Sequence, residues 1–144
     1  MSTAFAHRNL PRLLLQAREA VMVHYRPNLR AHGLSDQQWR VLRVLGERGS
    51  ADTGQVAREA YLLGPSLTGV LARMERDGLV VRSRDPQDQR RSVIQATARG
   101  LELVQVLSSS IEAHYQRLER ELGKDKLTQL YLLLDELISL EDPA

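Results

Sequence analysis

Apolar side chains recur at helical spacing along residues 64–78. Positions that differ by three, four and seven residues fall on one stripe of an α-helix, and this stretch is long enough for about three and a half turns. Pro65 suits the first helical position and Gly78 suits the left-handed position just past the last turn. The apolar stripe comprises Leu67, Val70, Leu71 and Met74.

The opposite face of this predicted helix is nearly free of bulk and is edged by cations. It comprises Pro65, Thr68, Gly69, Ala72, Arg73 and Arg76. A face of this kind can approach another surface closely, and the N–H groups of its first turn can meet a phosphate or a base edge. An ordinary surface helix with a small-residue face would show the same pattern, so the neighbouring segments must decide between the two interpretations.

The neighbouring segments favour a DNA-binding motif. A short helix over residues 55–62, capped by Asp52 or Thr53, precedes the helix of residues 64–78. A tight turn at residues 63–64 separates the two. This is the spacing of a helix-turn-helix. Two β-rich runs follow, residues 79–84 and 91–96, and the polar segment 85–90 joins them as the tip of a hairpin. Helix, turn, helix and basic hairpin together predict a winged helix-turn-helix.

Further helices are predicted on both sides of this motif. Residues 8–31 form one helix with a kink or a last short turn at Pro27. Residues 35–48 form another, which Ser35 and Gln38 begin as a capping box. Thr97 caps a long helix that ends near residue 122, and a last helix follows residues 123–124. The expected fold class is mainly α with a small β wing.

The last predicted helix is apolar on two sides, so it needs more than one partner. One face comprises Leu127, Leu130, Leu134 and Leu137, and the other comprises Tyr131, Leu133, Ile138 and Leu140. We expect a homodimer built from the terminal helices of two copies; a self-contained antiparallel helical pair is the alternative. The domain assignment is a single domain over residues 1–144, with the winged motif at about 34–97 and dimerisation helices at about 8–31 and 98–141.

Composition and charge fit this prediction. Among 144 residues, 42% are hydrophobic, which is enough for a folded core, and no cysteine is available for a disulfide, a thiolate metal site or a redox switch. Neither a signal peptide nor an apolar run of ~18 residues is present, so a cytoplasmic location is expected. Residues 40–100 carry a net charge of +4, whereas residues 101–144 carry −5. Arginine supplies eighteen of the twenty cations, which favours a polyanionic partner for the middle of the chain.

An enzyme is disfavoured by the absence of any catalytic motif. The four histidines, at positions 7, 24, 32 and 114, are scattered and form no metal-ligand spacing, so neither a metal nor another cofactor is expected. No glycine-rich phosphate loop or hydrolase elbow occurs. A winged helix that serves only as a protein-interaction module is the other alternative.

The chain resembles the MarR family of winged-helix regulators over nearly its whole length. The matching segments are residues 34–39 (Leu-Ser-Asp-Gln-Gln-Trp), 65–68 (Pro-Ser-Leu-Thr), 71–79 (Leu-Ala-Arg-Met-Glu-Arg-Asp-Gly-Leu), 88–90 (Asp-Gln-Arg) and 96–100 (Ala-Thr-Ala-Arg-Gly). Ala96 departs from the family's usual leucine, at a position that affects entry into the next helix rather than DNA contact.

Within the family, the chain resembles regulators of the homoprotocatechuate (4-hydroxyphenylacetate) degradation operon. The segments that carry this finer match are residues 16–20, 25–27, 38–40 and 65–69. The resemblance implies a repressor that binds an inverted-repeat operator in double-stranded DNA and is released by a small aromatic acid. A member of the family that responds to a different effector, an antibiotic or another phenolic compound, remains the alternative.

The DNA-contacting residues follow from the predicted helix and wing. Ser66 and Thr68 can read base edges or hold phosphates, whereas Pro65 and Gly69 permit close approach. Arg73 reaches a phosphate or a guanine. In the wing, Arg90 is the candidate for the minor groove and Asp88 orients it, as the family's Asp-x-Arg motif also implies. Phosphate contacts are expected from Arg84, Gln89 and Arg91.

The effector site is expected where, as the resemblance implies, the dimer helices meet the winged motif. An anionic aromatic ligand needs a cation, a polar group for its hydroxyl and an apolar wall. Arg18 and Arg43 are the candidate cations, with Arg40 in reserve, and the remaining candidates are Met22, His32 and Trp39. Alternatively, Trp39 is plain core and Arg43 pairs with a nearby acid.

Overall fold

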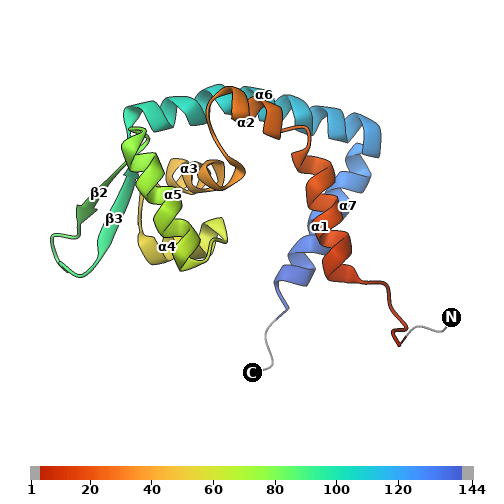
Figure 1. Cartoon of the computed structure of the whole chain (residues 1–144). Helices are drawn as coiled ribbons and strands as arrows, with labels where there is room; N and C mark the ends of the chain where they lie inside the picture. Colours follow the sequence, from red (N-terminus) through yellow and green to blue (C-terminus); the bar gives the residue numbers. More distant parts are fainter. Residues whose placement is uncertain (1–3, 141–144) are drawn as a thin grey trace. The chain divides into compact units, whose positions relative to one another are not determined.

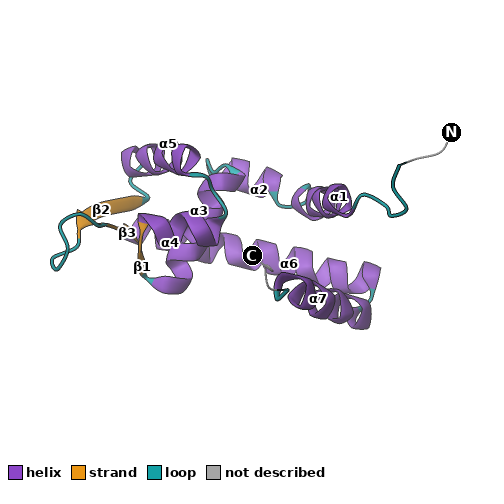
Figure 2. Cartoon of the chain, turned by 90° about the horizontal axis from the view of Figure 1, so that it is seen from below, coloured by secondary structure: helices purple, strands orange, loops and turns teal. Residues whose placement is uncertain are grey.

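The computed structural model describes residues 4–140, which divide into two compact units that meet in sequence after Ser108. Most of these residues are helical, and three short strands form one sheet (Figures 1 and 2). The elements are α1 (Leu10–Met22), α2 (Arg26–Ala31), α3 (Asp36–Arg48), β1 (Ser50–Asp52), α4 (Thr53–Ala60), α5 (Gly64–Arg76), β2 (Val80–Arg84), β3 (Ser92–Ala96), α6 (Ala98–Leu122) and α7 (Lys124–Ile138). The expected class, mainly α with a small β wing, is confirmed.

The helix expected over residues 8–31, with a kink or a last short turn at Pro27, is divided into α1 and the short α2. Proline has no N–H to donate and its ring clashes with the carbonyl four residues earlier, so Pro27 cannot continue α1 and instead stands in the first turn of α2. Asn9 caps α1 by accepting a bond from the Arg12 N–H at 3.1 Å. Tyr25 and Leu29, which lie between this break and α3 in the sequence, are buried.

Helix α3 is the centre of the N-terminal core. Ser35 caps it as predicted, because its Oγ accepts from the Gln38 N–H at 3.1 Å while the Gln38 Oε1 accepts from the Ser35 N–H at 2.9 Å. Leu42 and Leu45 are completely buried and Trp39 nearly so. A helix that is capped and buried in this way can hold the elements packed around it in position.

Helices α4 and α5 form the predicted helix-turn-helix. Of the two residues that the sequence offered as the cap of α4, Asp52 holds that position and makes a capping box with Gln55. The predicted stripe of α5 faces the core, with Leu67, Leu71 and Met74 buried. Gly78 follows the helix at a φ of 75°, as its assignment to the left-handed position requires.

The wing is a three-stranded antiparallel sheet, one strand more than the sequence indicated. Strands β2 and β3 match the predicted runs, and their order in the sheet is β1-β3-β2. The additional strand, β1, lies between two predicted helices, where the sequence indicated no strand. It places Ala51 opposite Ile94, the fully buried residue of the central strand. The edge of β3 would otherwise be unpaired, and three residues suffice to cover it.

The sheet joins α6 through a close backbone approach. Thr97 caps α6 as predicted by accepting from the Gly100 N–H at 3.1 Å, and its own N–H donates to the Leu79 carbonyl at 3.0 Å. A β-carbon at Gly100 would lie 2.4 Å from that carbonyl oxygen. Only glycine allows this approach.

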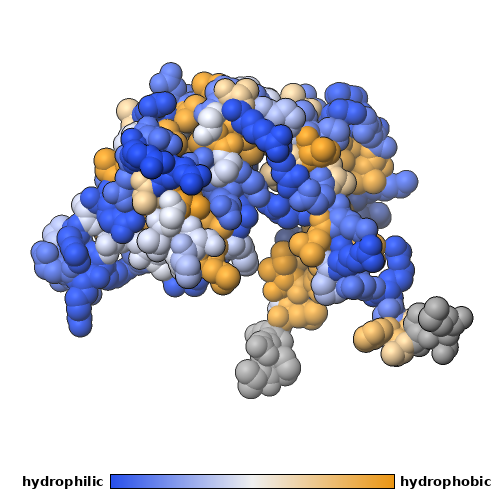
Figure 3. Space-filling model, in the orientation of Figure 1, coloured by the Kyte–Doolittle hydropathy of each residue, from blue (hydrophilic) through white to orange (hydrophobic). Residues whose placement is uncertain are grey.

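The C-terminal unit contains the last turns of α6 and all of α7, with Ile111 and Leu127 buried. Its large apolar side chains are otherwise largely exposed in the single chain, and Figure 3 shows such side chains as an orange patch on α7. They include Leu130, Leu133, Leu137, Ile138 and Leu140.

Among residues 4–140, no helix has both the length and the apolar character needed to cross a bilayer.

Candidate nucleic-acid interface

The face of α5 predicted to meet DNA is open in the structure. Pro65, Ser66, Thr68, Gly69 and Arg73 are all exposed. A hollow of about 280 Å³ lies along this face, where the first turns of α5 pass the start of α3. Its lining is Ser35, Gln37, Gln38, Pro65, Ser66, Gly69, Val70 and Arg73. No heavy atom would lie within 4 Å of a β-carbon at Gly69, so the approach to the helix is unobstructed there.

The N-terminus of α5 has no side-chain cap. Its N-cap residue is Leu63, whereas α3 and α4 begin with the capping boxes of Ser35 and Asp52. The first N–H groups of a helix have no partner within the helix, and they carry the positive end of its dipole. The start of α5 therefore keeps donors that a phosphate oxygen can accept from. The Thr68 hydroxyl donates to the Gly64 carbonyl at 3.0 Å and keeps its lone pairs for another partner.

The wing holds its arginines in different ways. Arg90 is 93% exposed at the tip, and Asp88 accepts from both its backbone N–H and its Nε, at 3.1 and 3.4 Å. Arg84 donates to the Gln89 carbonyl at 2.8 Å, which closes the hairpin from within. Arg91 lies directly before β3, next to the tip segment, where its Nη2 donates to Asp52.

The contact between Arg91 and Asp52 ties the wing to α4. The pKa of the Asp52 carboxyl is lowered, first by the hydrogen bond from the Gln55 N–H and then by the guanidinium of Arg91. The same pair raises the pKa of Arg91. Its guanidinium is therefore already engaged within the protein, in contrast to the Arg90 guanidinium, which extends into solvent.

The two arginines of the exposed α5 face have no partner in the part of the chain that the structure describes. Neither the Arg73 nor the Arg76 guanidinium makes a hydrogen bond or an ion pair there. By contrast, Arg82 on β2 pairs with Glu75 at 3.0 Å. Cations without an internal counter-ion can neutralise phosphates without first breaking a contact within the protein.

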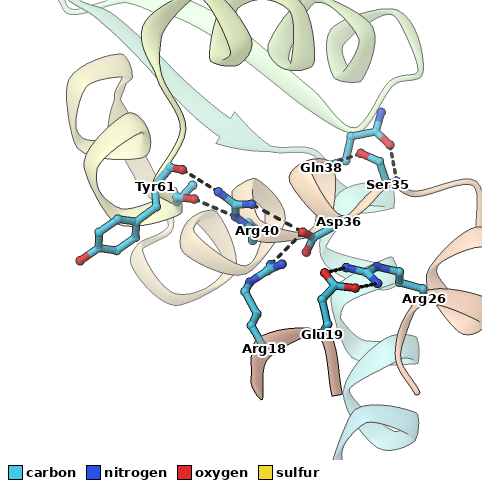
Figure 4. A network of polar contacts seen from close by, with 9 residues as sticks. Arg18, Glu19, Arg26, Ser35, Asp36, Gln38, Arg40 and Tyr61 are labelled. Atoms are coloured by element: carbon cyan, nitrogen blue, oxygen red, sulfur yellow. Dashed lines mark hydrogen bonds and ion pairs between the residues drawn. The ribbon is translucent and has the colours of Figure 1, made fainter. Parts of the chain in front are cut away.

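Two of the predicted effector residues meet at a carboxylate that the sequence reasoning omitted (Figure 4). Arg18, on α1, donates to the Asp36 Oδ2 at 2.8 Å, and the Arg40 Nη1 lies 3.5 Å from the same oxygen. The other oxygen, Oδ1, is buried and has no hydrogen-bond partner in the described part of the chain. Arg40 also donates to the carbonyls of Ala60 and Tyr61, at 2.8 and 2.6 Å.

The other effector candidates differ in accessibility. Met22 and Trp39 are buried in the N-terminal unit. Arg43 is on the exposed side of α3, where it pairs with Glu47 at 3.1 Å, one turn away. The His32 Nδ1 lies 2.9 Å from the carbonyl oxygen of Asn28. The structure thus brings Arg18 and Arg40 together around Asp36 and engages Arg43 and His32 separately.

The residues missed by the sequence reasoning lie at helix ends. Asp36 stands four residues before Arg40, a spacing that indicates an ion pair on one helix, but its contact with Arg18 spans eighteen residues. Tyr61 ends α4 in a left-handed conformation that no pattern of residue types indicates. Within residues 4–140, no group of three or more histidine, cysteine or acidic side chains is arranged to hold a metal ion.

Comparison with known proteins identifies the family. The profile of the MarR family matches residues 32–91. The chain is 41% identical to the HTH-type transcriptional regulator FarR of Neisseria gonorrhoeae, over 99% of this chain and 97% of that protein. It is 45% identical to the homoprotocatechuate degradative operon repressor of Escherichia coli, over 93% and 90% of the two chains. The crystal structure of NadR in complex with 4-hydroxyphenylacetate superposes with a TM-score of 0.86 at 41% identity, covering 98% of this chain and all of that one.

The chain belongs to the MarR family of winged helix-turn-helix transcriptional regulators. The predicted resemblance is thereby confirmed, and the chain is a regulator rather than an enzyme.

Proposed function

We propose that this protein is a DNA-binding repressor of an aromatic-acid degradation operon and that a small phenolic acid releases it from its operator. The observation that carries the proposal is the similarity to the homoprotocatechuate operon repressor, 45% identical over 93% of the chain. The exposed α5 face and the arginine wing support the DNA-binding part. The NadR structure, solved with 4-hydroxyphenylacetate, supports the class of effector.

Helix α5 enters the major groove with its small-residue face. Pro65 and Gly69 add no bulk there, so the helix can approach the base edges, where Ser66 and Thr68 donate or accept. The uncapped first turn binds a phosphate. Arg73, which has no partner within the described chain, neutralises a phosphate on the flank of the groove.

The wing reaches the adjacent minor groove. Arg90 at the tip inserts into a narrow, A·T-rich segment, where the negative potential is strongest. Asp88 limits the rotamers of Arg90 before DNA binds, because it accepts from both the backbone and the side chain of that residue. Arg84, Gln89 and Arg91 lie beside phosphates, and Arg91 also anchors the hairpin through Asp52.

Two copies act together. The exposed apolar side chains of α7, with Leu10, Leu14 and Leu15 on α1, are the surfaces that a second copy buries. A two-fold dimer presents two recognition helices to an inverted repeat whose half-sites lie about one turn of DNA apart. Light scattering should therefore give about twice the 16.3 kDa of one chain. A particle of single-chain mass at micromolar concentration would contradict the dimer.

The effector site is built around Asp36. Its buried Oδ1 lacks a partner in the described chain, so it can accept a hydrogen bond from a phenolic hydroxyl without losing an internal contact. The ligand carboxylate pairs with Arg18 or Arg43, while Met22 and Trp39 supply the apolar wall and His32 a further polar contact. Arg40 stays in reserve because the protein already uses its guanidinium.

A gel shift on the DNA upstream of the gene and its neighbours tests the proposal, with 4-hydroxyphenylacetate added to the preformed complex. We expect a specific complex that the acid dissociates. Calorimetry with Arg18→Ala and Arg43→Ala then identifies the cation, because the variant that lacks it binds the acid at least tenfold more weakly. Failure to bind any upstream duplex would contradict DNA regulation, and a complex insensitive to phenolic acids would favour a MarR-type regulator with a different effector.

We place the protein in the cytoplasm, where its operator is.

A further inference from the structure

Tyr61 stands in a backbone conformation that its side chain disfavours. It ends α4 at φ 54° and ψ 51°, and within residues 4–140 it is the only residue other than glycine with a positive φ. In this region the β-carbon of an L-residue crowds the following carbonyl oxygen, which is why glycine or asparagine is the usual choice. A bulky aromatic residue in this conformation is an outlier that needs a reason.

Burial does not supply the reason. The Tyr61 side chain is 83% exposed, and its ring points away from the protein in Figure 4. No hydrophobic contact with the core offsets the backbone strain. The phenolic end of the side chain is therefore available to a partner outside the chain.

The backbone around Tyr61 is held firmly. Arg40 donates to the carbonyl oxygens of Ala60 and Tyr61, at 2.8 and 2.6 Å, and the Leu62 N–H donates to the Ala57 carbonyl at 3.0 Å. The next side chain, Leu62, is buried. Strained residues persist where the surrounding structure over-determines them, and they concentrate at functional sites. Here these contacts hold the backbone from which the exposed aromatic ring extends.

That place adjoins the start of the recognition helix. Tyr61 precedes Gly64, the first residue of α5, by three positions, so its Cα lies within roughly 14 Å of that of Pro65. The ring and the first turn of α5 are both exposed, and only two residues separate Tyr61 from the start of that helix. A tyrosine hydroxyl is among the side-chain groups that position proteins on DNA through phosphate contacts.

We infer that Tyr61 is a DNA-contacting residue and Arg40 its positioning residue. The Tyr61 hydroxyl donates to a phosphate oxygen beside the entry of α5 into the groove, and the ring lies against the sugar of that nucleotide. This inference rests on the proposed function, because it places a contact on the same operator. The Tyr61 hydroxyl would add an uncharged DNA contact from the turn between α4 and α5 to the DNA contacts expected from α5 and from the wing.

The test measures fluorescence anisotropy on the operator for Tyr61→Phe and Tyr61→Gly over a series of salt concentrations, together with the melting temperature of each variant. Removal of the hydroxyl alone should weaken binding about fivefold, and removal of the whole side chain about tenfold or more. Glycine relieves the positive φ, so Tyr61→Gly should melt at or above the wild-type temperature while binding less well. A neutral donor releases no counter-ions, so the slope of affinity against salt should not change.

Wild-type affinity in both Tyr61 variants would overturn the inference. So would loss of binding confined to Tyr61→Gly with a lowered melting temperature, because the ring would then be supporting the fold or docking a protein. If the wild type binds no duplex at all, the proposed function itself fails and the inference fails with it. That outcome is distinct from equal binding by the wild type and the variants.

Discussion

Arg91 donates a hydrogen bond to Asp52 across thirty-nine residues of sequence, and so joins the wing, just before β3, to the N-terminus of α4. Asp52 uses its other oxygen to accept from the Gln55 N–H at 2.8 Å. One carboxylate thereby serves as a helix cap and as an anchor for the hairpin. The pairing of β1 with β3 and this ion pair together connect the wing to the helix-turn-helix.

Replacement of Asp52 by alanine should lower the free energy of unfolding by about 1 kcal/mol, the usual value of an N-cap. Asp52→Asn keeps an oxygen for the Gln55 N–H and should lose less. The native contacts lower the pKa of this carboxyl below its ordinary value of 3.8, so its stabilisation is complete above that pH and is lost as the pH falls below it. Urea unfolding between pH 6 and pH 3 should therefore show the wild type and Asp52→Ala converging in acid. A constant difference at every pH would contradict the role of the charge.

Arg90→Ala should lower operator affinity by about an order of magnitude or more, because it removes a cation that reaches the minor groove. Dimerisation should not change, since the side chain is 93% exposed at the wing tip. Anisotropy titration measures the first quantity and sedimentation the second. Asp88→Asn leaves the arginine in place but holds it less firmly, so its loss should be smaller. Unchanged operator binding by Arg90→Ala would exclude the minor-groove role.

Arg73→Ala should flatten the dependence of log affinity on log salt by about one, because one phosphate contact and its released counter-ion are lost. The matched control is Arg43→Ala, which removes an arginine from the exposed side of α3 that pairs with Glu47. This control should leave the slope unchanged in the absence of effector. Equal slopes for all three proteins would mean that Arg73 touches no phosphate.

Leu63→Asp should separate stability from DNA binding. An aspartate at this N-cap position can accept from the first-turn N–H groups of α5 and should stabilise the fold by about 1 kcal/mol. The same carboxylate occupies the donors that we assign to a phosphate and repels that phosphate. Operator affinity should therefore fall while the melting temperature rises. Leu63→Ser, a neutral cap, should reduce affinity less than Leu63→Asp does.

Two glycine-to-alanine substitutions should have opposite effects. A β-carbon at Gly69 meets nothing within 4 Å, so Gly69→Ala should fold at least as stably as the wild type and gain up to about 1 kcal/mol. Its methyl group would nevertheless stand on the DNA-facing side and should weaken operator binding. A β-carbon at Gly100 would lie 2.4 Å from the Leu79 carbonyl oxygen, so Gly100→Ala should destabilise the fold by about 1–3 kcal/mol. Thermal melts and operator titrations of the two proteins check both statements.

Local sequence was sufficient for most of the helices and for the hairpin. The apolar stripe of α5, the capping box of Ser35 and the cap at Thr97 involve residues within seven positions of one another, so their geometry follows from the helix itself. The break before α2 has an equally local cause in Pro27. For the same reason the sequence predicted which face of α5 is exposed.

Contacts between distant residues could only be decided by the tertiary structure. Strand β1 is three residues long and carries no alternation of its own; it exists because β3 offers Ala51 a partner in Ile94. The meeting of Arg18 with Asp36, and of Arg91 with Asp52, depends on how whole helices and the sheet pack, because charged side chains show no preference in sequence among many possible partners. The left-handed turn at Tyr61 depends on Arg40, twenty-one residues earlier, which holds its carbonyl. The sequence by itself therefore determined most of the helices, the caps at Ser35 and Thr97, and the family, whereas packing decided which of the charged residues are engaged within the protein and which extend into solvent.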